Sequence, residues 1–172
     1  MANDSALNIL VITSRPLLTA ERRPIHLLDV AEERRRIEKS LKSNAHAKAS
    51  FVAEATTNNV NAALLQSWDV VHFAGHGSSD GCLLLEDGCG VAHFVEAEEI
   101  AALLKNKAIP LLVLSACYSE TVAYKLLAAG LPAVIAIDAK QPIADKAAII
   151  FAEHFYGGPA SGLTVKIGRA HV

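Results

Sequence analysis

Short apolar runs alternate along the chain with segments in which apolar residues recur at helical spacing. The apolar runs contain many β-branched residues and are too short for helices, so they predict strands that are buried on both faces of a sheet. These strands are expected at residues 7–12, 49–55, 68–74, 109–114 and 131–137. Helices are expected in the amphipathic segments at residues 29–41, 57–66, 96–105, 119–129 and 143–156.

The regular alternation of strand and helix determines the predicted fold class. Such chains form mostly parallel sheets with helices on both faces, because their crossovers are right-handed. Residues 82–95 depart from the alternation, since the Asp87-Gly88 pair between two apolar runs is typical of a tight hairpin turn. Asp29 is placed to cap the first helix, and Gly130 to end the fourth. The sequence therefore predicts an α/β protein with a β-hairpin after the third strand.

Composition narrows the class of protein further. The chain has 172 residues, 52% hydrophobic and 20% charged, which fits one soluble domain with a proper core. Its net charge of -2 gives no reason to expect nucleic acid or an anionic membrane as a partner. No apolar run reaches transmembrane length, and the N-terminus does not resemble a signal peptide. Three cysteines in such a chain favour reduced thiols and a cytoplasmic location.

Two strand ends carry the reactive side chains. Residues 70–77 read VVHFAGHG and end in His76, and residues 111–117 read LLVLSAC and end in Cys117. Ligand chemistry in open parallel sheets gathers at the carboxyl ends of the strands. If both strands end on the same edge, an imidazole and a thiol face each other across a cleft, which is the arrangement that a cysteine nucleophile needs. The alternative interpretation is that Cys117 is an inert buried thiol.

The two boxes VHFAGHG and LVLSAC, in this order, resemble the His and Cys boxes of the caspase-like cysteine peptidases, and in detail those of the CHAT domains. The resemblance extends over the opening strand LNILVI, the hairpin segment LLLEDG and the segment AAGLPAVIAI, and it continues to about residue 166. Two ordered boxes joined by a βα unit are more specific than a lone short motif. The resemblance implies a caspase-like three-layer αβα sandwich that spans residues 1–166.

The resemblance also implies roles for the boxes. His76 matches the catalytic histidine of the family and Cys117 its nucleophile, and the backbone N–H groups of Gly77 and Cys117 match its oxyanion hole. The implied reaction is peptide hydrolysis through a thioester, with His76 as general base and acid and with no cofactor. The expected partners are a protein or peptide substrate and regulatory domains or partner proteins, such as attached sensor or repeat modules.

Three further residues are expected near the dyad. His72 is interpreted as a packed or supporting histidine rather than a catalyst, and Ser115 likewise as a supporting residue. Asp138 follows the fifth strand and is a candidate for a specificity pocket that selects Lys or Arg of the substrate. Its alternative role is to cap the turn beside Lys140.

No metal site is expected. Cys82, Cys89 and His93 lie close together in the sequence, but their spacing across a hairpin fits no standard zinc-ligand pattern.

The sequence leaves alternative functions to consider. The main alternative is a catalytically silent interaction or signalling module with the caspase-like fold. A nucleotide-binding domain is disfavoured, because Thr13-Ser14-Arg15-Pro16 follows the first strand in place of a glycine-rich loop.

Residues 167–172, IGRAHV, resemble the translation of a sequencing-adapter oligonucleotide. We therefore expect a non-native tail there and a domain that is incomplete at its C-terminus.

Overall fold

A computed structural model describes residues 6–42, 47–137 and 145–157 of the chain. Its centre is a sheet of five strands in the order β2-β1-β3-β6-β7, and every pairing in this sheet is parallel. The strands are β1 (Leu7–Thr13), β2 (Ala47–Val52), β3 (Val70–Ala74), β6 (Leu111–Ser115) and β7 (Val134–Ile135). The predicted α/β class with a mostly parallel sheet is therefore confirmed.

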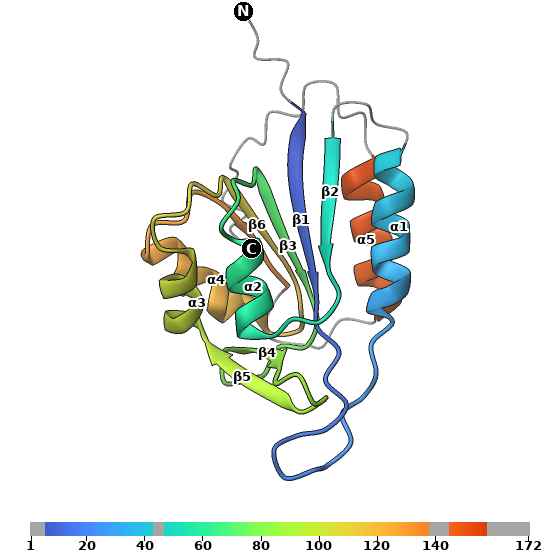
Figure 1. Cartoon of the computed structure of the whole chain (residues 1–172), viewed down its shortest axis with the longest axis vertical. Helices are drawn as coiled ribbons and strands as arrows, with labels where there is room; N and C mark the ends of the chain where they lie inside the picture. Colours follow the sequence, from blue (N-terminus) through green and yellow to red (C-terminus); the bar gives the residue numbers. More distant parts are fainter. Residues whose placement is uncertain (1–5, 43–46, 138–144, 158–172) are drawn as a thin grey trace, which may run out of the picture.

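Helices cover both faces of this sheet, which gives the molecule three layers (Figure 1). One face carries α1 (Val30–Lys42) and α5 (Asp145–Gly157), which pack against each other. The opposite face carries α2 (Thr57–Ala63), α3 (Ala97–Leu104) and α4 (Ser119–Ala128). Among the described residues, none of the helices has both the length and the apolar character needed to cross a membrane.

The hairpin β4 (Cys82–Glu86) and β5 (Ala92–Glu96) forms a separate antiparallel sheet, as predicted. It lies next to the carboxyl ends of the central strands (Figure 1). The prediction of a tight Asp87-Gly88 turn was wrong, because the two arms are joined by residues 87–91. The Asp87 side chain accepts hydrogen bonds from the backbone N–H groups of Cys89 and Val91, at 2.7 and 2.9 Å, and so stabilises the longer loop.

Local signals fix the ends of the helices. Asp29 Oδ1 accepts the backbone N–H of Glu32 at 3.0 Å, which confirms the predicted cap of α1. Gly130 follows α4 with a φ of 101°, a left-handed conformation that glycine adopts without steric cost. The last strand is much shorter than the predicted residues 131–137: β7 has two residues, lies at an edge of the described sheet and pairs there with β6.

Alternate residues of each central strand pack into two different apolar clusters. In β1, Ile9 and Val11 face the layer of α1 and α5, whereas Leu10 and Ile12 face the layer of α2, α3 and α4. All four side chains are buried. This double burial is what an apolar run without polar alternation predicts for a central parallel strand.

One buried polar network interrupts the cluster beneath α1 and α5. The side chain of His72 in β3 is fully buried, with Nε2 at 3.0 Å from Glu33 Oε1 of α1 and Nδ1 at 3.1 Å from the Tyr156 hydroxyl of α5. Burial raises the pKa of Tyr156, so its hydroxyl stays protonated and donates to Nδ1. The Nε2–H group then donates to the Glu33 carboxylate, and every member has a partner. The network joins β3 to both helices of this face.

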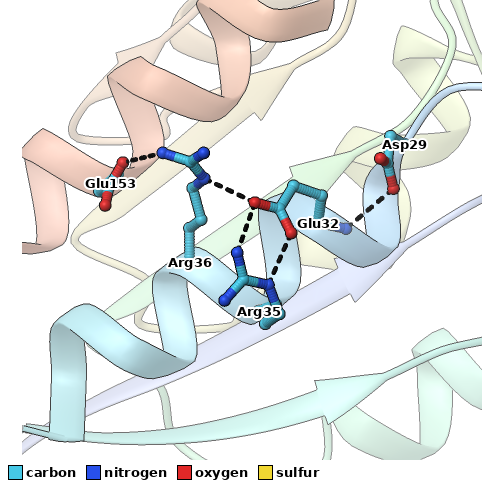
Figure 2. A network of polar contacts seen from close by, with 5 residues as sticks. All are labelled: Asp29, Glu32, Arg35, Arg36 and Glu153. Atoms are coloured by element: carbon cyan, nitrogen blue, oxygen red, sulfur yellow. Dashed lines mark hydrogen bonds and ion pairs between the residues drawn. The ribbon is translucent and has the colours of Figure 1, made fainter.

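A second network lies at the surface between the same two helices (Figure 2). Glu32 accepts two hydrogen bonds of 2.6 Å from Arg35 and one of 2.7 Å from Arg36, whose guanidinium also pairs with Glu153 of α5. The hydrogen bonds from Arg35 and then Arg36 lower the pKa of Glu32 to about 2. Because these side chains are partly exposed to water, we expect them to contribute less to stability than the buried network does.

The buried network gives the first prediction. Replacing His72 with phenylalanine leaves the Glu33 carboxylate buried without a donor, so it should lower the free energy of unfolding by about 3–5 kcal/mol. The double variant His72→Phe/Glu33→Leu removes both partners and should recover part of this loss. Guanidinium chloride unfolding measures both values, with Glu32→Gln in the partly exposed surface network as the control. Equal stability of His72→Phe and the wild type would show that the network does not hold the helices.

Candidate active site

His76 and Cys117 lie just beyond the carboxyl ends of two neighbouring strands that are paired in register. β3 and β6 are parallel neighbours in which Ala74 pairs with Ser115, and the Gly75 N–H donates to the Ser115 carbonyl oxygen at 3.1 Å. His76 lies two residues beyond Ala74, and Cys117 two residues beyond Ser115. The two predicted box residues therefore follow the carboxyl ends of adjacent strands, both within two residues of the sheet.

The two loops that carry these residues are in direct contact at Gly77. A Cβ atom on Gly77 would lie 2.0 Å from the backbone oxygen of Cys117 and 3.6 Å from the Ala116 Cβ. No side chain fits in that space, so position 77 requires glycine. The group that approaches Gly77 so closely is the backbone of Cys117.

A backbone carbonyl orients the His76 imidazole. The ring is half-buried, and its Nε2 lies 2.7 Å from the carbonyl oxygen of His26, in the loop between β1 and α1. A carbonyl oxygen only accepts hydrogen bonds, so Nε2 carries the proton and the neutral ring has its lone pair at Nδ1. Sequence reasoning missed His26, because a contact made by a backbone carbonyl leaves no signature in residue type.

The surroundings of His76 favour the neutral ring. Burial lowers the pKa of His76 below its ordinary value of 6.5, and it outweighs the His26 carbonyl and the Asp145 carboxylate, which both act to raise it. At pH 7 the imidazole is therefore present mostly as the form that accepts a proton.

Cys117 occupies a sharp turn between β6 and α4. Tyr118, which follows it, has a φ of 58°, a left-handed conformation that is uncommon for residues with a side chain and is often found at functional sites. Ser119 anchors the turn, since its hydroxyl donates to the Leu114 carbonyl at 3.3 Å and accepts the Ile137 N–H at 3.0 Å. Cys117 is partly buried, and none of the three cysteines, all of which are described, forms a disulfide.

The structure describes two of the other predicted site residues, His72 and Ser115. His72 is packed in the buried network behind the site. Ser115 is also buried, and among the residues that the structure describes its hydroxyl oxygen has no hydrogen-bond partner. Asp138 lies outside the described residues, and its role in substrate selection stays a prediction. Within the described ranges, no three His, Cys, Asp or Glu side chains come together in a way that could hold a metal ion.

Comparison with known proteins assigns the chain to a family. The family model described as CHAT domain matches residues 11–166. The chain belongs to the CHAT domain family. This family is related to the caspase-like cysteine peptidases. The match begins within β1 and includes both boxes and the other four strands of the central sheet.

One solved structure shows the same fold as this CHAT domain. The crystal structure of Chaetomium thermophilum Raptor aligns with a TM-score of 0.50 and 9% sequence identity, over 73% of this chain. The CHAT domain spans 14% of that much longer chain. At this identity the likeness concerns the fold alone. A search among curated proteins found no match.

The contact at Gly77 gives the second prediction. In the CHAT domain, Gly77→Ala places a methyl group against the Cys117 carbonyl and should force the two loops apart. We expect a loss of about 1–3 kcal/mol of stability, the usual cost of overpacking, and a lower melting temperature. The control is Gly157→Ala, where the new Cβ meets Ser40 Oγ at an ordinary 3.4 Å. Equal melting temperatures for the two variants would contradict the close contact of the loops.

Proposed function

We propose that this CHAT domain is a cysteine endopeptidase domain, in which His76 and Cys117 hydrolyse peptide bonds, and that attached modules or partner proteins regulate it. The observation that carries the proposal is the in-register pairing of β3 with β6. Because of this pairing, His76 and Cys117 follow the carboxyl ends of neighbouring strands and lie in loops that touch each other. The relation of the family to cysteine peptidases supports the choice of reaction.

The orientation of His76 supports its role as the base. With Nε2–H donating to the His26 carbonyl, Nδ1 is the ring atom that accepts the proton of the Cys117 thiol. The sulfur then attacks the carbonyl carbon of the peptide, and the oxygen becomes negatively charged. His76 returns the proton to the leaving amine as the thioester forms. Water, deprotonated by the same ring, hydrolyses the thioester and restores the thiol.

Backbone groups are available to stabilise the charged intermediate. We assign this role to the N–H groups of Gly77 and Cys117, which belong to the two touching loops. Each such donor is commonly worth about 3 kcal/mol of transition-state stabilisation. The role depends on the position of the backbone, so the requirement for glycine at position 77 links packing directly to the reaction.

The third prediction tests the dyad. A peptidyl acyloxymethyl ketone should label Cys117 in the wild type, and His76→Ala should slow this labelling by about 100-fold or more, because general-base assistance is lost. Peptide mapping by mass spectrometry identifies the modified cysteine and gives the rate.

Cys89 provides the internal control for this experiment. It is an exposed thiol on the loop of the hairpin, so iodoacetamide should modify it equally in the wild type and in His76→Ala. Labelling of Cys117 that does not depend on His76 would reject the peptidase and favour a catalytically silent interaction module.

A further inference from the structure

Asp145 joins the start of α5 to the segment that precedes α1. Its Oδ2 accepts the backbone N–H of Asp29 at 2.8 Å, across 116 positions of sequence. Asp29 in turn caps α1 through the Glu32 N–H. The Asp145 carboxylate therefore fixes the point at which the loop from β1 enters the helix.

The same segment holds the imidazole of His76. His26 lies three residues before Asp29, and its carbonyl oxygen accepts the Nε2–H of His76 at 2.7 Å. Between the two hydrogen bonds the segment buries little apolar surface: His26 and Asp29 are exposed, Leu27 is 47% exposed, and Leu28 is half-buried. A segment with little buried apolar surface is placed mainly by its hydrogen bonds. On the β1 side the Ile25 N–H donates to the Leu17 carbonyl oxygen at 2.9 Å, so the His26 carbonyl is held between this bond and the bond that Asp145 makes at the Asp29 end.

We propose that Asp145 is a positioning residue for His76: through residues 26–29 its carboxylate holds the His26 carbonyl, and with it the tautomer and orientation of the imidazole. The catalytic consequence rests on the proposed function, whereas the hydrogen-bond chain can be measured without turnover. Nothing in the sequence pattern around Asp145 indicates this role.

Electrostatics point in the same direction. The Asp145 carboxylate acts to raise the pKa of His76, so it lies close enough for the ring to sense its charge. His26 also acts on the ring: its carbonyl acts to raise the pKa of His76, and its side chain acts to lower it. Removing the negative charge of Asp145 should therefore lower the pKa of His76 further below 6.5.

Two substitutions separate the charge from the hydrogen bond. Asp145→Asn removes the charge and keeps an oxygen that can accept the Asp29 N–H, whereas Asp145→Ala removes both. We expect Asp145→Asn to lower the pKa of His76 and to keep the Nε2–H tautomer. Asp145→Ala should lower the pKa as well and add the Nδ1–H tautomer. Glu153→Gln is the matched control, because that carboxylate is on the same helix but pairs with Arg36.

The fourth prediction is tested by NMR. Long-range proton–nitrogen spectra of protein with ¹⁵N-labelled histidines report the pKa and tautomer of His76, which the His76→Gln spectrum assigns. The acid limb of the Cys117 labelling rate should move to lower pH in Asp145→Asn, because a ring with a lower pKa stays neutral at lower pH. In Asp145→Ala the maximal rate should fall about tenfold or more, since small misplacements of a catalytic group are costly.

The outcomes distinguish the two proposals. If the tautomer and pKa of His76 change as expected in a protein that shows no labelling of Cys117, the positioning role stands and the peptidase proposal fails. An unchanged His76 spectrum in folded Asp145→Ala would overturn the positioning role. So would an altered preference for cationic peptides with an unchanged His76 spectrum, because Asp145 would then act on the substrate.

Discussion

The in-register pairing of β3 with β6 is the constraint on which the candidate site depends. Every residue of both strands is buried, and His72 makes the register specific. A slip of one residue would turn His72 away from Glu33 and Tyr156 toward the apolar cluster on the other face. An imidazole and a carboxylate would then be buried without partners, at a cost of several kcal/mol. The register that satisfies His72 is also the one that brings His76 and Cys117 to the same edge.

Backbone contacts, more than side-chain contacts, convert this register into a site. Gly77 admits the Cys117 carbonyl, Tyr118 turns the chain into α4 in a left-handed conformation, and the His26 carbonyl determines which nitrogen of His76 is free to accept a proton. The helices matter for the same reason. The buried network ties α1 and α5 to β3, so the helix that follows the His26 loop is fixed to the sheet.

Local signals made much of the fold predictable from the sequence. Apolar runs identified the strands, Asp29 and Gly130 marked helix ends, and the topology of parallel sheets placed the two box residues at one edge. Contacts between distant segments left no such signal. His76 is hydrogen-bonded to His26, 50 positions away in the sequence, and Tyr156 to His72, 84 positions away. Residue type alone predicts neither pair. The hairpin loop was misjudged because an Asp-Gly pair predicts a tight turn, whereas the Asp87 side chain stabilises a longer one.

Direct detection of the covalent intermediate is the most decisive measurement for this account. A peptide ester that acylates quickly and deacylates slowly should add its acyl mass to the intact protein after acid quenching. Peptide mapping should then place the thioester on Cys117. The account predicts this adduct in the wild type and a decay of the adduct that depends on His76. An acyl group on another residue, or turnover that persists in Cys117→Ala, would contradict it.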